Sequence, residues 1–220
     1  MEILKKKFWL TAIILLVLAL DQSLKIWVKT HMEYGEEFKI LGLDWALIHF
    51  VENNGMAFGL SLGGEYGKLV LSIFRIIAVG FLVYYLNFLL NSGAKKGILI
   101  SFSLILAGAI GNIIDSAVYG MIFSESTYHG GLAEIFPEAG GYASFLHGKV
   151  VDMFYFPIIN GFLPDWLPLW GGKHIMFFQP VFNVADASIS IGVINMLLFN
   201  RTFFANQKTE KIEEEKKESN

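Results

Sequence analysis

Four stretches of the chain are apolar over a length that can cross a lipid bilayer, and polar segments separate them. They cover residues 8–28, 69–90, 97–118 and 181–200. An α-helix rises 1.5 Å per residue, so about 20 apolar residues span the hydrocarbon core of a membrane. The pattern therefore predicts an all-α integral membrane protein with four transmembrane helices.

Positive charge predicts the orientation of these helices. Three lysines at 5–7 precede the first apolar run, and two more at 95–96 separate the second run from the third. Because basic residues stay on the cytoplasmic side, both termini are predicted to be cytoplasmic. A basic start before an apolar run is also the pattern of a cleavable signal peptide. This run, however, continues to Val28 without a clean small-x-small cleavage site, which favours a retained helix.

Two long segments then lie outside, at residues 29–68 and 119–180. The first alternates loosely between apolar and polar positions over 40–51, which is typical of short strands or an interfacial ribbon. The second holds a stretch at 124–147, rich in Gly, Ser and Glu, that we expect to be a mobile surface insertion. It also holds an aromatic-rich stretch at 160–178 that suits the membrane interface.

Composition agrees with a membrane protein. Hydrophobic residues make up 54% of the 220-residue chain and its mean hydropathy is +0.51, whereas soluble domains are about 45–50% apolar. The absence of cysteine excludes disulfides and thiol nucleophiles, and without a basic, aromatic-interleaved patch nucleic-acid binding is not expected. The histidines at 129, 147 and 174 lack the close spacing of metal ligands, so we expect no metal. We expect one four-helix domain over residues 1–205 and a charged cytoplasmic tail over 206–220.

Polar side chains inside or beside the apolar runs are the candidate functional residues. Asn183 and Asp186 begin the fourth run three residues apart, which predicts that they share a helical face. Asn112 and Asp115 repeat this spacing at the end of the third run, and Asp152 lies within an apolar pentapeptide. An ionisable group at the centre of a membrane helix costs about 2.5–3.5 kcal/mol, so each is a functional-site hypothesis.

Three further polar residues have ordinary structural explanations as well. Asp21 and Lys25, at i and i+4 of the first run, are typical of an ion pair near the interface, with the lysine extended toward water. Asn53 begins an Asn-Asn-Gly turn, which is also typical of a loop returning to the membrane. The predicted topology nevertheless brings all these polar groups to one depth, near the outer leaflet boundary, where a chance distribution would not gather them.

Asp152 and Asp186 suggest an acid/base pair. Two neighbouring carboxyls cannot both ionise cheaply, so they share a proton, as in aspartic proteases. One then acts as a base toward water and the other as an acid toward the substrate carbonyl. This chemistry needs neither a cofactor nor a metal. A serine mechanism at Ser188 or Ser190 is less favoured, because no histidine or lysine lies at a matching depth.

Five motifs follow one another in a recognisable order. They are DQSLK at 21–25, NNGMAF at 53–58, GAIGNIID at 108–115, VVDMF at 150–154 and FNVAD at 182–186. Together they resemble the lipoprotein signal peptidase (signal peptidase II) family of intramembrane aspartic peptidases. The resemblance extends from residue 21 to about residue 200.

The resemblance implies a four-helix bacterial inner-membrane enzyme with a small extracytoplasmic β-cradle, which suits residues 29–68, and an extended loop over the site. It implies removal of the signal peptide from a diacylglyceryl-modified prolipoprotein, just before the lipidated cysteine. Asp152 and Asp186 match the catalytic aspartates. The positions that match site-shaping residues are Asp21, Lys25, Asn53, Gly108, Asn112, Asp115 and Asn183.

The expected partners follow from the same resemblance. They are the lipid-modified prolipoprotein, membrane lipid and a globomycin-type peptide inhibitor, bound by a monomer that uses no cofactor. Three departures affect substrate preference and loop gating rather than the dyad. Ser116 stands where the family usually has arginine, Met56 where it usually has alanine, and the insertion at 124–147 is longer than usual.

Two other classes of protein share some of these features. A small transporter or proton channel also contains buried carboxylates, but it predicts acidic groups spread through the depth of the membrane. A non-enzymatic membrane assembly or chaperone protein does not require both Asp152 and Asp186. Mild effects of Asp→Asn substitutions would therefore favour that class.

Overall fold

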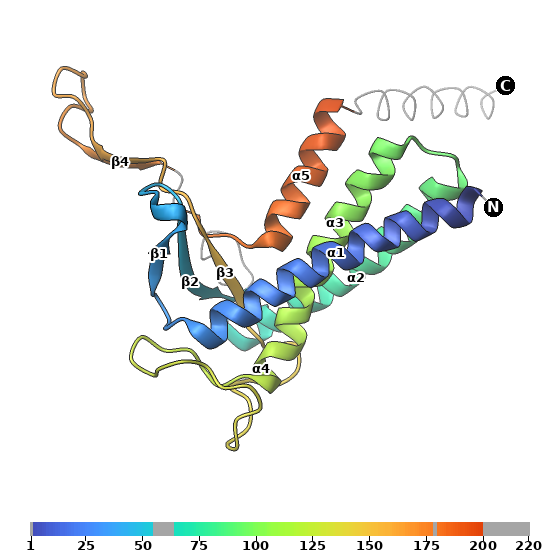
Figure 1. Cartoon of the computed structure of the whole chain (residues 1–220), viewed down its shortest axis with the longest axis horizontal. Helices are drawn as coiled ribbons and strands as arrows, with labels where there is room; N and C mark the ends of the chain where they lie inside the picture. The colour runs from blue at the N-terminus through green and yellow to red at the C-terminus, as the bar shows by residue number, and fades with distance from the viewer. Residues whose placement is uncertain (1, 55–63, 178–179, 200–220) are drawn as a thin grey trace. The chain divides into compact units, whose positions relative to one another are not determined.

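The computed structural model describes residues 2–54, 64–177 and 180–199. Long helices dominate it, and Figure 1 shows them together with the strands. The long helices are α1 (Glu2–His31), α2 (Gly64–Asn91), α3 (Lys96–Ile114) and α5 (Val184–Phe199). Among the described residues, Gly67–Asn91 and Lys96–Ile122 are long and apolar enough to cross a membrane, and α5 is a shorter apolar helix. That α1 and α5 also span a membrane stays a prediction.

The third helix is longer than the sequence predicted and changes its winding. After α3 the chain continues through a π-helical turn, η3 (Asp115–Tyr119), into α4 (Gly120–Ile122). Single π-helical turns inside α-helices often occur at functional sites. Here the wide turn begins at Asp115, one of the predicted site residues.

The start of the last helix corrects a prediction. Helix α5 begins at Val184, whereas the apolar run predicted a start at residue 181. Phe182 instead forms an antiparallel bridge with Phe154, with main-chain N–H···O distances of 2.8 and 3.0 Å. Asn183 therefore precedes the helix, and the prediction that it shares a helical face with Asp186 is wrong. The bridge holds the main chain before Asn183 in an extended conformation.

The chain also forms a small antiparallel sheet, as predicted. Its strands are β1 (Glu37–Lys39), β2 (Leu47–Asn53) and β3 (Val150–Tyr155), in the order β1-β2-β3. The sequence predicted strands within residues 29–68, but the third strand comes from the second long segment. The register of β2 on β3 shifts between Ile48 and Val51, and beyond the shift Val51 pairs with Asp152. This pairing brings the two long segments together.

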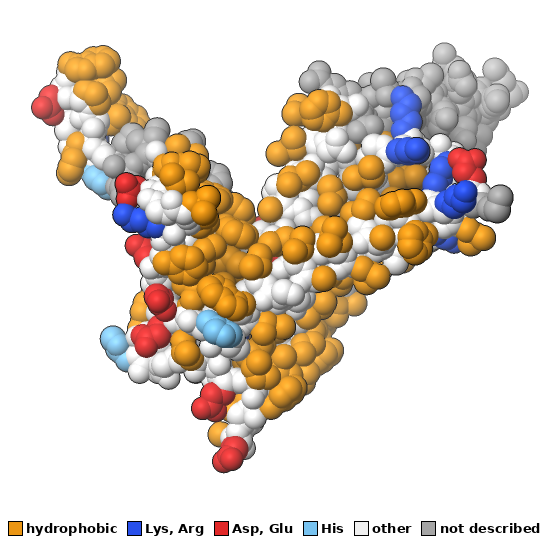
Figure 2. Space-filling view, viewed as in Figure 1, with side chains coloured by type: hydrophobic (Ala, Val, Ile, Leu, Met, Phe, Trp, Pro, Cys, Tyr) orange, Lys and Arg blue, Asp and Glu red, His pale blue; other side chains and the backbone are white. Residues whose placement is uncertain are grey.

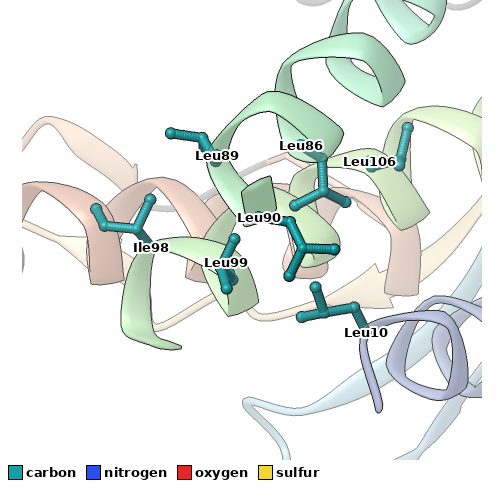
Figure 3. Packing of buried hydrophobic residues seen from close by; sticks show 7 residues of the cluster. All are labelled: Leu10, Leu86, Leu89, Leu90, Ile98, Leu99 and Leu106. Carbon is teal, nitrogen blue, oxygen red and sulfur yellow. The ribbon is translucent and has the colours of Figure 1, made fainter. Parts of the chain in front are cut away.

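The described residues form two compact units, each with its own core. The first contains the described parts of Met1–Ala19, Ile76–Ile110 and Ala185–Asn220. Its core is a cluster of buried aliphatic side chains, and Figure 3 shows Leu10, Leu90 and Leu99 near its centre. The buried members of the cluster are Leu10, Leu86, Leu89, Leu90, Ile98, Leu99 and Leu106.

The second unit contains the described parts of Leu20–Arg75 and Gly111–Val184. Its core lies against one face of the sheet. Phe50, Val151 and Met153 contribute their side chains from that face to the core. The remaining buried members are Val28, Met32, Tyr119 and Phe123. Because successive residues of a strand point to opposite faces, Asp152 lies on the other face from Val151 and Met153.

The insertion at 124–147 is tied to the end of the third helix. Tyr142 N–H donates to the Phe123 carbonyl at 3.1 Å, and Ala143 N–H to the Gly120 carbonyl at 2.8 Å. At its far end, a Cβ on Gly148 would lie 2.1 Å from the Asp115 carbonyl oxygen, so only glycine fits there. Main-chain contacts therefore hold the C-terminal part of the insertion, and its mobility stays a prediction.

The aromatic-rich stretch forms a second, separate hairpin. Its strands are β4 (Ile159–Phe162) and β5 (His174–Phe177). Trp166, Leu169 and Trp170 in the connecting loop are 60–89% exposed, and Figure 2 shows hydrophobic side chains at this tip. Exposed tryptophans are common at membrane–water interfaces, and the placement of this tip at one stays a prediction.

Candidate active site

Helix α1 carries a buried stripe of polar side chains. Asp21, Lys25 and Lys29 follow one another at intervals of four residues and are fully buried. Lys25 forms ion pairs with Asp21 at 2.9 Å and with Asp115 at 2.8 Å. The interpretation of Lys25 as a side chain extended toward water is therefore wrong. Two carboxylates compensate for its burial, whereas an isolated buried ammonium would be very costly.

Gln22 also belongs to this network, although the sequence pattern did not indicate it as a site residue. Its amide nitrogen donates to Asp115 Oδ1 at 2.9 Å and to Asp21 Oδ2 at 3.1 Å. Its amide oxygen accepts a hydrogen bond of 3.1 Å from the Tyr119 hydroxyl. The signal that could have identified Gln22 is its spacing of three residues from Lys25, which places both on one side of α1.

Asn112 and Asp115 connect α1 to the residues around Asp152. Asn112 Oδ1 accepts from the Lys25 ammonium at 3.0 Å, and Asp115 Oδ2 lies 2.8 Å from the same ammonium. The two side chains therefore lie on one face of the third helix, as predicted. Asp115 Oδ2 also accepts from the main-chain N–H of Val151 at 3.2 Å. Asn112 Oδ1 receives a further hydrogen bond of 3.2 Å from Asn183. The network thus reaches Val151, the residue before Asp152, and Asn183.

Asp152 is held by two amides from different parts of the chain. The side chain is 3% exposed, and Asn183 Nδ2 donates to its Oδ1 at 2.7 Å. Asn53 Nδ2 donates to its Oδ2. Each oxygen therefore has a neutral donor that fixes its position. An amide N–H can donate to an ionised or a protonated carboxyl, so this arrangement is compatible with both protonation states.

Gly108 determines how closely α3 and α5 approach. A Cβ on Gly108 would lie 2.2 Å from the Ala185 carbonyl oxygen and 2.7 Å from Ile189 Cγ1. Farther along the same pair of helices, the Ser188 hydroxyl donates to the Leu104 carbonyl at 2.8 Å. Small residues allow this kind of close packing between membrane helices. Gly108 therefore fixes the position of the first turn of α5 against α3.

Asp186 lies in that first turn and is partly buried. The helix dipole stabilises negative charge at this end of a helix. Asp186 and Gly108 belong to the first compact unit. Seven of the predicted site residues are joined within the second unit. They are Asp21, Lys25, Asn53, Asn112, Asp115, Asp152 and Asn183.

Of the two residues that differ from the usual family residue, Ser116 lies in the described structure and Met56 does not. Ser116 is buried in the π-helical turn, where its hydroxyl donates to the Asn112 carbonyl at 3.1 Å. Its main-chain carbonyl accepts from Gly148 N–H at 2.8 Å, at the end of the insertion.

Comparison with known proteins places these features in a family. The family model described as signal peptidase (SPase) II matches residues 13–203. A lipoprotein signal peptidase of Porphyromonas gingivalis is 54% identical over 188 residues, which cover 85% of this chain and 80% of the relative. The lipoprotein signal peptidase of Amoebophilus asiaticus is 38% identical over 200 residues, covering 89% and 79%.

Two solved structures resemble the chain, each described as a bacterial membrane enzyme structure by the in meso method. One, at 2.3 Å resolution, has a TM-score of 0.56 and 24% identity and covers 90% of both chains. The other, at 1.9 Å, has a TM-score of 0.55 and 26% identity, covering 86% of this chain and 90% of that one. The family model matches most of the length of this chain, and the two relatives are 54% and 38% identical to it. This chain therefore belongs to the signal peptidase II family.

Proposed function

We propose that this protein is a membrane aspartic endopeptidase that removes the signal peptide from diacylglyceryl-modified prolipoproteins, just before the lipidated cysteine. Membership of the signal peptidase II family supports the substrate class, since its relatives carry the name lipoprotein signal peptidase. The catalytic pair in this proposal is Asp152 and Asp186.

The observation that carries the proposal is the environment of Asp152. A nearly fully buried carboxyl is held at both oxygens by the amides of Asn53 and Asn183. Such donors orient the carboxyl without fixing its protonation state, as a group that must alternately accept and release a proton requires. Asp186 is proposed as the second member because the FNVAD motif at 182–186 resembles the second catalytic-aspartate motif of the family.

The proposed reaction divides proton transfer between the two carboxyls. One carboxylate removes a proton from water as the water oxygen bonds to the carbonyl carbon before the lipidated cysteine. The other carboxyl, in its acid form, gives its proton to the carbonyl oxygen. As the intermediate collapses, the carbonyl returns its proton, the C–N bond breaks and the first carboxyl protonates the departing nitrogen. The pair thus returns to its single shared proton, and its titration belongs to both residues together.

The remaining site residues support this pair in the proposal. Asn53 and Asn183 orient Asp152, and Asn112 orients Asn183. Lys25 forms ion pairs with both Asp21 and Asp115, and Asp115 accepts from the Val151 N–H directly before Asp152. In the first compact unit, Gly108 fixes the helix turn that carries Asp186.

The proposed setting is a single four-helix domain over residues 1–205 in the bacterial inner membrane. Both termini would be cytoplasmic, with the tail at 206–220, and the site would lie near the outer leaflet. The lysines at 5–7 and 95–96 support this orientation through the positive-inside rule. The proposed partners are the prolipoprotein, surrounding lipid and a globomycin-type peptide inhibitor, bound by a monomer without a cofactor.

The test of the activity uses purified protein in detergent and two forms of one prolipoprotein. One form carries diacylglycerol on its cysteine and the other has that cysteine unmodified. We expect cleavage of the lipidated form alone, with mass spectrometry locating the cut directly before the cysteine and EDTA leaving the rate unchanged. A wild-type protein that cleaves neither form would contradict the proposal and favour a transporter or channel.

A further inference from the structure

Beside the active site lies a buried polar cluster that the proposed reaction does not use. It consists of Lys29 on α1, Glu52 on β2 and Ser126 in the insertion, and we call it the Lys29 cluster. Lys29 is fully buried, and its ammonium forms an ion pair with Glu52 Oε1 and donates to Ser126 Oγ at 2.7 Å. Ser126 Oγ also donates to Glu52 Oε1 at 3.4 Å.

Two aromatic rings also lie near the Lys29 ammonium, and one of them belongs to the insertion. The Lys29 ammonium lies 5.2 Å from the centre of the Tyr142 ring. It lies 5.5 Å from the centre of the ring of Phe123, the residue directly before the insertion. Both distances are within the range of cation–π attraction. Burial lowers the pKa of Lys29 and Glu52 opposes this shift, with smaller contributions from Lys149 and Glu125. A single lysine thus joins α1, β2 and the insertion.

Stability alone does not account for this ion pair. Buried ion pairs can often be replaced by apolar residues without loss of stability, since desolvation offsets the attraction. Here Glu52 Oε2 is also buried without a hydrogen-bond partner in the described part of the chain, which adds to the cost. An arrangement with this cost points to a role in fixing a position.

The position concerned is that of Asn53. Glu52 and Asn53 are neighbours on β2 and point to opposite faces of the sheet. Glu52 faces the core with the Lys29 cluster, while Asn53 donates to Asp152 on the other face. In the register of the sheet, Glu52 lies opposite Val151 and Val51 opposite Asp152. Fixing the Glu52 side chain therefore fixes the strand segment from which Asn53 reaches Asp152.

We propose that the Lys29 cluster positions Asn53 on the Asp152 carboxyl, so that the insertion at 124–147 is a fixed support of the active site. Lys29, Glu52 and Ser126 are then positioning residues that act through Asn53. This inference rests on the proposed function, because it assumes that Asp152 is catalytic.

The first test compares Glu52→Gln with Glu125→Gln in the cleavage assay. Glu52→Gln leaves the buried ammonium without its counter-charge, and we expect kcat to fall about 10- to 100-fold with little change in KM, the scale of a misplaced catalytic group. Glu125 is an exposed carboxylate in the same insertion that pairs with Lys149 at 3.0 Å, so Glu125→Gln should leave kcat unchanged. Ser126→Ala keeps both buried charges and should lower kcat about threefold. Unchanged kcat in Glu52→Gln and Ser126→Ala would overturn the proposal.

The second test separates positioning from folding. In an Asn53→Ala background, Glu52→Gln should cost less than about twofold in kcat, because its effect passes through Asn53. An equal loss in both backgrounds would show that Glu52 acts elsewhere. The double variant Lys29→Met/Glu52→Gln removes both buried charges, so its melting temperature should recover while kcat stays low. If kcat recovered with the melting temperature, the pair would serve stability alone.

A third variant distinguishes failure of this inference from failure of the proposed function. Asp152→Asn should be inactive. An active Asp152→Asn would contradict the catalytic role of Asp152 and this inference with it. An inactive Asp152→Asn together with fully active Glu52→Gln and Ser126→Ala would contradict the positioning role alone.

Discussion

Asn183 donates a hydrogen bond of 2.7 Å to Asp152, although 31 residues separate them in the chain. The same amide nitrogen lies 3.2 Å from the Val151 carbonyl oxygen and 3.2 Å from Asn112 Oδ1. Asn183 is fully buried and immediately precedes α5. One side chain, directly before α5, therefore joins strand β3 to the third helix.

Asn183→Ala should lower kcat about 10- to 100-fold, because it removes a hydrogen bond that holds the buried Asp152 carboxyl, at a cost of about 1–3 kcal/mol. The measurement is cleavage of a lipidated prolipoprotein, with thermal melts to confirm folding. Asn195 is the matched control: it lies farther along α5 and donates to Ser101 Oγ at 2.8 Å. Asn195→Ala should retain kcat, and equal losses in the two variants would show that Asn183 has no special role.

Lys25→Met should destabilise the protein by about 3–5 kcal/mol, because it leaves the buried carboxylates of Asp21 and Asp115 without a cation. Thermal melts in detergent measure this as a lower melting temperature. Lys6→Met is the control, since Lys6 pairs with an exposed Glu2 on the same helix and should melt as wild type does. A Lys25→Met protein with the wild-type melting temperature would contradict the buried network.

Gly108→Ala should destabilise the protein by about 1–3 kcal/mol and lower activity, because the new methyl group overlaps the Ala185 carbonyl and displaces the turn that carries Asp186. Gly80 is the matched control within α2, since a Cβ there meets no atom within 4 Å. Gly80→Ala should be neutral or stabilising by up to about 1 kcal/mol, through helix propensity. If both variants behaved alike in melts and cleavage, close packing at Gly108 would not matter.

Stability at alkaline pH should depend on Tyr142. Burial raises the pKa of its hydroxyl above the usual value of about 10. The folded state therefore holds this proton more tightly than the unfolded state, and the resulting stability is present below about pH 10 and lost as the pH rises further. Tyr142→Phe should reduce this alkaline loss by about 1 kcal/mol per pH unit.

Unfolding at pH 9 and pH 11 measures the difference between Tyr142→Phe and wild type. The control is Tyr128→Phe, in the same insertion, where the ring is 65% exposed. Tyr128→Phe should lose stability between the two pH values as steeply as wild type. An equally steep loss in Tyr142→Phe would contradict the assignment.

The sequence was sufficient to identify the residues of the polar network, because an ionisable or amide side chain in an apolar run is costly without a partner. Asp21, Lys25, Asn112 and Asp115 were all recognised in this way, and the structure joins them. The direction of the Lys25 side chain was not predictable, since an i,i+4 pair can point outward or inward. The choice depends on Asp115, 90 residues away in sequence.

Long-range pairing explains the other errors. Strand β3 completes a sheet begun about 100 residues earlier, and local alternation carries no information about that partner. The same limit applies to the start of α5, where the Phe182–Phe154 bridge overrides an apolar run that favours helix. Lys29 lies just beyond the first apolar run, and Glu52 lies just before the Asn-Asn-Gly turn. Both were missed because charged residues at such places are ordinarily solvated. The spacing of Lys29 four residues after Lys25 was the available signal.

The central claim is that Asp152 and Asp186 share the acid/base work, and the most direct test is the cleavage rate of Asp152→Asn and Asp186→Asn on a diacylglyceryl-modified prolipoprotein. Asparagine keeps the size of the side chain but cannot transfer the proton. Each variant should therefore fold, as judged by its melting temperature, and lose at least about 100-fold in kcat. A folded variant of either residue that cleaves at nearly the wild-type rate would contradict the dyad.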